Sequence, residues 1–143
     1  MPYEILRDKE SLDGRTDVIE IGPGKYQRKH FLPGFIFIDE CDFSCAEASI
    51  RKYHPSYNHY EMNNISSDSA TLIIEEWRKI AATILNSTGQ EIWLLLGYHH
   101  TPNAHAIERI YDERKLISVM LNEIANYVET LLKRNSWISI LGV

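Results

Sequence analysis

The hydrophobic pattern of the chain is clearest over residues 65–86, where apolar side chains recur every three or four positions. This spacing predicts an amphipathic helix with one face turned toward a core. Serine and aspartate side chains at 66–69 can cap its N-terminus, and Gly89 is the expected stop. Because Trp77 is in phase with the isoleucines, we expect it to be a core residue rather than a ligand-stacking one. The predicted apolar stripe consists of Ile73, Trp77, Ile80 and Ile84, with Ile74, Ala81 and Leu85 beside it.

A second helical pattern runs from residue 107 or 112 to residue 134. Lys133 and Arg134 fall in its last turn, where cations interact favourably with the helix dipole. The final residues, 137–143, alternate between two faces, which predicts a strand that docks in the sheet beside residues 35–38. The apolar stripe of this helix consists of Ile117, Leu121, Ile124, Val128 and Leu131.

Shorter apolar runs in the first half of the chain predict strands. Residues 17–21 alternate, with Ile19 and Ile21 on one face. Residues 35–38 are apolar on both faces, which is typical of a central strand. Three further segments are strand candidates, namely residues 3–7, 26–32 and 57–62.

Two more segments predict short helices. Residues 45–53 suit a helix of about three turns that ends before Pro55, because proline disfavours helical backbone at the residue before it. Residues 91–98 fit either a buried strand or a short helix, and their leucines favour the helix. Residues 99–105 are expected to form a loop. The chain, residues 1–143, therefore predicts a single α+β domain, with a small, mostly antiparallel sheet packed against two long helices plus one or two short helices.

Composition agrees with a globular domain and narrows the range of partners. The 143 residues are 44% hydrophobic and 24% charged, and such a chain can bury a core without disulfides or metals. No apolar run is long enough to span a bilayer, and the N-terminal stretch MPYEILRDKE lacks the features of a secretory signal. We therefore expect a cytoplasmic protein with no membrane partner. The net charge of −5 without a lysine- or arginine-rich run argues against nucleic acid and suits a basic protein partner.

Histidines offer one candidate for metal chemistry. His99, His100 and His105 are close in sequence, and Glu108 follows His105 by three positions. Such a spacing can hold a metal on one helical face, but the HEXXH motif is absent. A small metal-binding or hydrolytic domain that uses the loop 99–105 is thus the alternative interpretation, while we expect no native metal and no cofactor.

The two cysteines give little support for catalysis. Cys41 and Cys45 would lie one helical turn apart, which is a poor geometry for a disulfide and matches no usual zinc pattern. Either thiol could pair with His54 as a nucleophile, but no local pattern positions them together. Nucleophile-elbow and phosphate-loop motifs are also absent. We therefore expect a protein that is not an enzyme.

The densest acidic cluster of the chain surrounds the start of the first predicted helix. Carboxylates gather at helix N-termini for capping and dipole reasons, and they can equally form a patch that binds a partner. The window that follows is rich in tyrosine, histidine and asparagine, and tyrosine in particular is enriched at interfaces. The candidate partner contacts are Asp39, Glu40, Asp42, Glu47, Tyr57, His59, Tyr60 and Glu61.

Three pieces of the chain, taken in order, resemble a known family in their layout. They are YNHYEMNNIS leading into the helix IIEEWRKI, the long helix NEIANYVETLLKR and the terminal WISILGV. This arrangement resembles small immunity proteins of bacterial polymorphic toxin systems, including those of contact-dependent growth inhibition. The resemblance implies a non-enzymatic cytoplasmic protein that binds one cognate toxin domain and blocks its active site. Such toxins are often nucleases with basic substrate-binding surfaces, and an acidic patch could mimic the phosphate backbone. A third interpretation, a regulatory module that dimerises through a helix face, leaves the oligomeric state open.

Overall fold

The computed structural model describes residues 2–143, and these form one α+β domain. Its five strands make a single antiparallel sheet in the order β1-β3-β2-β5-β4. The expected fold class is therefore confirmed. Along the chain the elements are β1 (Ile5–Leu6), the 3₁₀ turn η1 (Glu10–Leu12), β2 (Val18–Pro23), β3 (Ile36–Asp39), α1 (Glu40–Tyr53), β4 (Met62–Ser66), α2 (Ser67–Ile84), α3 (Gly89–Leu95), α4 (Ala104–Asp112), α5 (Arg114–Leu132) and β5 (Trp137–Leu141).

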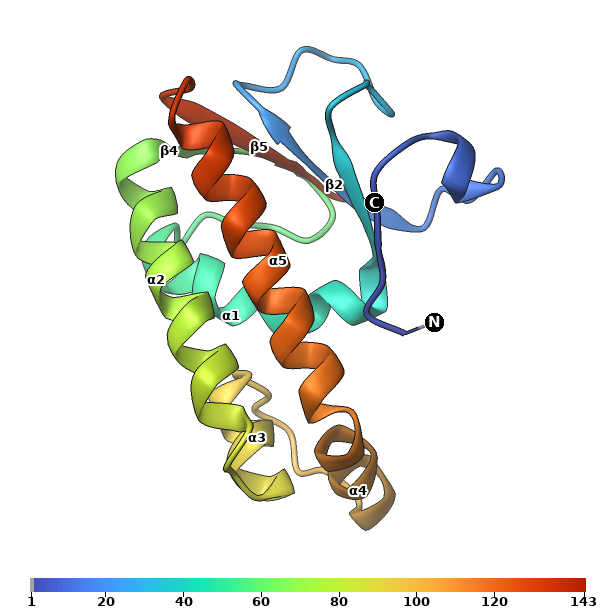
Figure 1. The fold of residues 1–143 in the computed structure, drawn as a ribbon, viewed down its shortest axis with the longest axis vertical. Helices are drawn as coiled ribbons and strands as arrows, with labels where there is room; N and C mark the ends of the chain where they lie inside the picture. The colour runs from blue at the N-terminus through green and yellow to red at the C-terminus, as the bar shows by residue number, and fades with distance from the viewer. Residues whose placement is uncertain (1) are drawn as a thin grey trace.

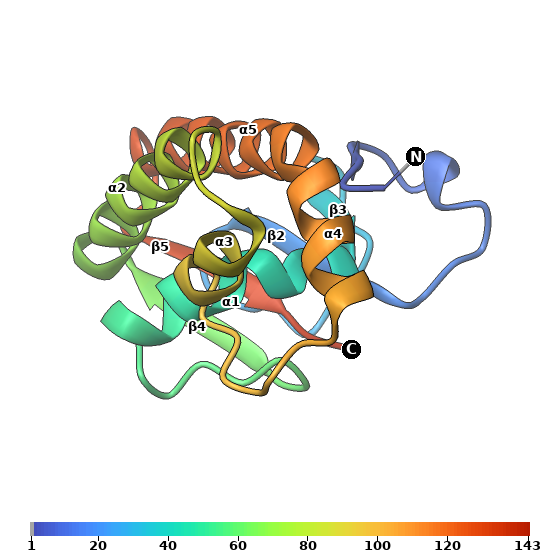
Figure 2. The same ribbon diagram turned by 90° about the horizontal axis from the view of Figure 1, so that it is seen from below.

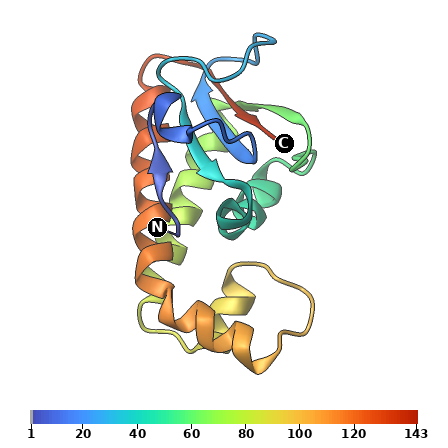
Figure 3. The same ribbon diagram turned by 90° about the vertical axis from the view of Figure 1, so that its right-hand side faces the viewer.

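Helices α2 and α5 form a layer, and helices α3 and α4 form a separate pair. The long helices α2 and α5 run side by side and cover one face of the sheet (Figure 1). Helix α1 crosses below the strands, and Figure 2 shows it on the same side of the molecule as α3 and α4. In Figure 3 the α3–α4 pair projects beyond the end of the sheet, so that α1 lies between the sheet and this pair.

The apolar stripe of α2 faces the core as predicted. Trp77 is 1% exposed, and its Nε1 donates a hydrogen bond to the carbonyl of Ala46 in α1 at 3.0 Å. Leu85, by contrast, is exposed, because the helix ends at Ile84. The expected stop at Gly89 is also wrong, since Gly89 is the first residue of α3. That helix starts there because Thr88 and Glu91 form a capping box.

The second long helix is interrupted. Its apolar stripe is buried along α5 except for the half-buried Leu131. Of the two expected starts, residue 107 is wrong because the helix breaks at Glu113, whereas residue 112 lies close to the observed start at Arg114. The helix ends at Leu132, so Lys133 and Arg134 follow it and do not lie in its last turn. Asn103 caps α4 by accepting from the amide of Ala106, so His105 lies in a helix and not in a loop. Residues 91–98 lie mostly in α3, which confirms the helical interpretation.

The sheet agrees with the predicted strands at three places and differs at three. Residues 3–7, 17–21 and 35–38 contribute β1, β2 and β3. The terminal strand does not dock beside residues 35–38, because β1 and β2 already occupy both edges of β3. Instead, Ile140 of β5 pairs with Ile21 and Asn63.

Residues 26–32 are not a strand. Arg28 and Phe31 have positive φ angles of 60° and 56°, which a strand does not allow. The buried Glu20 of β2 holds this segment instead, since it accepts from the amide of Phe31 at 2.7 Å and lies 2.6 Å from His30 Nδ1. The segment therefore covers the sheet face opposite the helices.

Residues 57–61 are a turn, and the predicted strand starts only at Met62. The side-chain amide of Asn63 donates to the carbonyls of Asn58 and Glu61 at 2.9 and 3.0 Å. These bonds curl the chain over before it enters β4. Consequently, the turn packs against α1 rather than extending the sheet.

Candidate functional site

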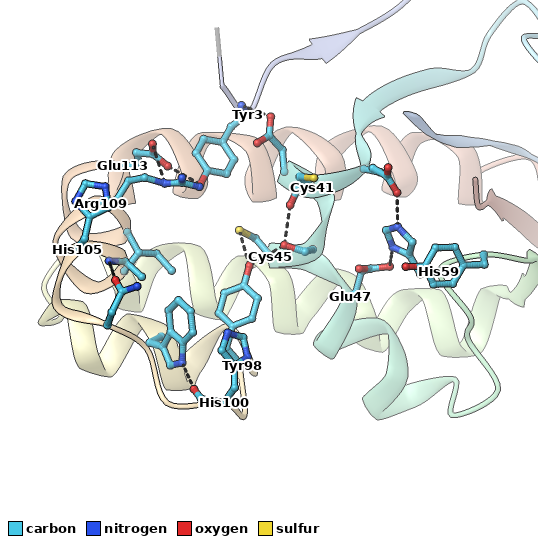
Figure 4. Close-up of a pocket in the computed structure, with 18 residues that line it drawn as sticks. Tyr3, Cys41, Cys45, Glu47, His59, Tyr98, His100, His105, Arg109 and Glu113 are labelled. Carbon is cyan, nitrogen blue, oxygen red and sulfur yellow. Dashed lines mark hydrogen bonds and ion pairs between the residues drawn. The ribbon is translucent and has the colours of Figure 1, made fainter. Parts of the chain in front are cut away.

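A cleft of about 900 Å³ lies between α1 and the segment 93–113 (Figure 4). Glu40 and Asp42 in the first turn of α1 line one side, which we call the acidic wall. The other side carries Trp93, Tyr98 and His100, which we call the aromatic wall. In Figure 4, Tyr98 and Cys45 stand between Arg109 and Glu113 at one end of the cleft and Glu47 and His59 at the other. Sequence segments far apart in the chain thus build a single site.

A buried network occupies the His59 end. Glu47 follows Glu40 by two helical turns, so both carboxylates point to the same side of α1. His59 Nδ1 lies 2.6 Å from Glu47 Oε2, and its Nε2 lies 2.9 Å from Glu40 Oε2. Tyr57 donates its hydroxyl to the same Glu47 oxygen at 2.6 Å. Because a carboxylate faces each ring nitrogen, the doubly protonated imidazolium can donate to both.

The same geometry determines the charge of His59. Desolvation by burial pulls the pKa of His59 down, but the hydrogen bonds to Glu40 and Glu47 outweigh it, and the pKa is raised. The protonated ring therefore ties the turn 57–61 to α1. Both of its nitrogens are engaged, so neither is free to act as a general base.

The predicted partner contacts separate into buried and exposed residues. Glu47 and Tyr57 are 5% and 6% exposed and therefore offer a partner little accessible area, contrary to the sequence prediction, although Glu47 still lines the cleft. They are buried because each satisfies the other's polar atom. Tyr60 is 71% exposed and meets the edge of the His59 ring at a centroid distance of 4.8 Å. Glu61 next to it is also exposed.

Asp39 and Asp42 at the start of α1 also have structural roles. Asp39 caps α1 by accepting from the amides of Cys41 and Asp42, and it pairs with Arg15 at 2.6 Å. Capping is therefore confirmed as one reason for the acidic cluster. Asp42 accepts from the amide of Tyr3 at 2.8 Å and faces the cleft. Of the predicted residues, the cleft lining includes Glu40, Asp42, Glu47, His59 and Tyr60.

The opposite end of the cleft was not predicted. Tyr3 donates its hydroxyl to Glu113 Oε2 at 2.6 Å, and Arg109 Nε lies 3.7 Å from Glu113 Oε1. Tyr3 and Glu113 are 110 residues apart, and no local pattern marks either of them. Only the fold reveals that the residues before β1 reach the junction between α4 and α5.

The aromatic wall was also missed. The Trp93 ring lies 4.7 Å from that of Tyr98 and 5.0 Å from that of His100, between centroids, and its Nε1 donates to the His100 carbonyl at 3.0 Å. The Tyr98 hydroxyl lies 2.7 Å from Ser44 Oγ and 3.5 Å from Cys45 Sγ. These contacts hold the segment after α3 against α1. An aromatic-rich stretch, WLLLGYHH, was the available signal in the sequence.

Burial and neighbouring carboxylates raise the pKa values of several groups in the cleft. Burial raises the pKa of Asp42, and the charges of Asp39 and Glu113 raise it further. Burial likewise raises the pKa of Cys45 to about 11, despite the hydrogen bond from Tyr98. The pKa of Cys41 is raised by burial and then by neighbouring carboxylates. Both thiols therefore stay protonated near neutral pH, where a thiolate nucleophile would be needed.

The sequence offered two other candidate sites, the histidine-rich segment with Glu108 and a cysteine–histidine pair with His54. His100 and His105 line the cleft, whereas His99 and Glu108 are exposed residues outside its lining. Within residues 2–143, no three histidine, cysteine, aspartate or glutamate side chains are grouped to hold a metal ion. His54 has its Nε2 3.2 Å from Ser56 Oγ at the end of α1.

Comparison with known proteins adds no assignment. No family model, no curated protein and no solved structure matches this chain. None of the helices described for residues 2–143 combines the length and apolar character that a bilayer crossing demands. Function must therefore be argued from the cleft itself.

Proposed function

We propose that this protein is a non-enzymatic inhibitor that binds the basic surface of a cognate toxin domain and covers its active site. The layout resemblance to immunity proteins of bacterial polymorphic toxin systems supplies the class of partner. The cleft and its rim supply the chemistry of recognition.

The observation that carries the proposal is the charge imbalance of the cleft. Its lining contains four carboxylates, Glu40, Asp42, Glu47 and Glu113, against two cationic groups, the guanidinium of Arg109 and the protonated ring of His59. The whole chain has a net charge of −5, so this local imbalance adds to the general one. A positively charged partner surface would be steered toward such a region, and its association would be fast and salt-sensitive.

The rim of the cleft provides a second feature of binding surfaces. Tyr60 is largely exposed, yet its ring is held in place against His59. An ordered, exposed tyrosine loses little conformational entropy on binding and is a frequent interface hot spot. Together with the adjacent Glu61, it offers an aromatic anchor beside a negative charge.

Two features favour binding over catalysis. The thiols of the cleft have raised pKa values, and His59 has both ring nitrogens tied to carboxylates. The polar groups are thus arranged to stabilise one another. Such an arrangement suits a rigid binding surface.

The test uses the gene next to this one. The C-terminal domain of the reading frame immediately upstream is expressed with and without this protein, and growth is measured. We expect arrest by the domain alone, normal growth of the pair and a stable complex on size-exclusion chromatography. A harmless domain, or two proteins that do not associate, would refute the proposal.

A further inference from the structure

The cleft is large enough for a side chain of the partner to enter it. Its volume of about 900 Å³ lies in the range of about 300–1,000 Å³ that is common for ligand sites. We propose that the cleft receives an arginine side chain of the partner, which stacks on the aromatic wall and pairs with the carboxylates of Asp42 and Glu113. This inference rests on the proposed function for the source of the arginine.

Asp42 in the acidic wall and Glu113 across the cleft have acceptor capacity that the protein does not use. Asp42 Oδ2 accepts from the Tyr3 amide, but no donor within residues 2–143 is hydrogen-bonded to its Oδ1. Glu113 has only a loose contact with Arg109, at 3.7 Å, on its Oε1. A guanidinium has five donors in a planar fork and can engage such free carboxylate oxygens.

The electrostatics of the cleft favour a cation. The raised pKa of Asp42 and those of Tyr3 and Cys45 all include contributions from nearby carboxylates, after the larger effect of burial. These groups resist negative charge chiefly because they are buried, and the nearby carboxylates add to this effect. An entering guanidinium would offset the charge of the carboxylates, whereas an anion or a neutral group would not.

The aromatic wall explains why the cation should be arginine. Guanidinium groups are weakly hydrated and stack on aromatic faces, while the lysine ammonium is compact and strongly hydrated. Trp93 is held by its bond to the His100 carbonyl, and Tyr98 by its contacts with α1. The rings therefore need little reordering when a planar group arrives.

The inference can be tested without the toxin. Nα-acetyl-L-arginine amide is titrated into the ¹⁵N-labelled full-length protein, and the indole signals are followed by NMR. Trp93 is the reporter in the cleft, while the core residue Trp77 and Trp137 in β5 serve as internal controls. We expect saturable shifts of Trp93 in the millimolar range, since a single side chain carries only part of an interface energy.

The analogues decide which chemistry is recognised. The citrulline analogue has nearly the same shape but no charge, and we expect it to cause no shift. The lysine analogue should bind more weakly than the arginine one. Absent Trp93 shifts, equal binding of any two analogues, or shifts spread over all three indoles would overturn the inference. Micromolar affinity for the free probe would also overturn it, because it would indicate a small-molecule site.

A matched pair of variants locates the binding. Asp42→Asn keeps an oxygen for the Tyr3 amide but removes the charge, and it should weaken binding by about tenfold through loss of a charge-assisted pair. Asp68→Asn removes an exposed carboxylate from the corresponding first turn of α2 and should leave binding unchanged. Unshifted Trp77 signals report that each variant is folded. Equal affinity of the two variants would contradict the proposed position.

The two proposals can fail separately. Neutralisation of the toxin without arginine binding would remove the cleft inference and leave the inhibitor function intact. Arginine binding without a toxic partner would do the opposite.

Discussion

Replacing Tyr57 with phenylalanine removes one hydroxyl from the buried end of the Glu47 network. That hydroxyl donates to Glu47 Oε2 at 2.6 Å, and both side chains are nearly inaccessible to solvent. A hydrogen bond to a charged group contributes about 1.5–3 kcal/mol to stability. His59 still pairs with Glu47 in the variant, so the carboxylate is not left alone. We therefore expect Tyr57→Phe to lower the free energy of unfolding by about 1.5–3 kcal/mol.

The assay is urea unfolding at neutral pH followed by tryptophan fluorescence. A domain of this size has a denaturant slope of about 1–3 kcal/mol per M. The predicted loss then moves the midpoint down by about 1 M urea without a change in slope.

Tyr53→Phe provides the matched control. Its hydroxyl lies 3.5 Å from Glu76 Oε2 at a partly buried position, a longer contact than that of Tyr57. We expect its removal to cost less than about 0.5 kcal/mol, because a contact of this length is a weak hydrogen bond. If both variants lose the same stability, or if Tyr57→Phe lies within about 0.5 kcal/mol of the parent protein, the network does not hold the turn as argued.

Three further predictions follow from the same structure. The raised pKa of His59 means that its contribution to stability is fully present below its unfolded pKa of about 6.5 and is lost as pH rises through the folded pKa. Urea midpoints measured across this range should therefore fall with pH more steeply in the parent than in His59→Asn, and parallel curves would count against the clamp. Trp77→Ala should cost about 3–5 kcal/mol in the same assay, since it empties a core position and removes the bond to Ala46, and a cost below about 1 kcal/mol would contradict that packing. Glu61→Lys, at the exposed rim, should slow association with the toxin domain in stopped-flow or biosensor measurements, with a smaller effect at high salt, whereas an unchanged on-rate would exclude this rim from the steering surface.

Local patterns in the sequence were enough for the apolar stripes of the two long helices, but not for the break between α4 and α5. The stripe of α2 depends on residues three or four positions apart, and burial of a single continuous face made it visible. Residues 26–32 misled because they resemble a strand locally, while the contacts that fix them come from Glu20 in another element. The place of β5 was also beyond local information, since it depends on which strand edges are already occupied.

Site residues that lie near one another in the sequence could be predicted, whereas those that only the fold brings together could not. Glu40 and His59 were found because an acidic cluster and an aromatic window stand near each other in the chain. Tyr98 and Glu113 were missed because their partners, Ser44 in α1 and Tyr3, lie more than fifty residues away in the sequence. The apolar periodicity of a helix indicates which face is turned to the core, but it does not indicate whether another face lines a cleft.

Two consecutive residues of helix α1 connect it to the core on one side and to the turn 57–61 on the other. The carbonyl of Ala46 accepts from Trp77 in the core, and the next side chain, Glu47, holds the histidine turn. Because the core anchor uses a backbone atom, the position of the helix does not depend on which side chains face the cleft. A substitution at the exposed Cys41 can therefore change the cleft without touching this anchor, whereas Glu40 and Ser44 also hold the histidine turn and Tyr98. A lineage under pressure to follow a changing partner could diversify its recognition surface here while the fold stays the same.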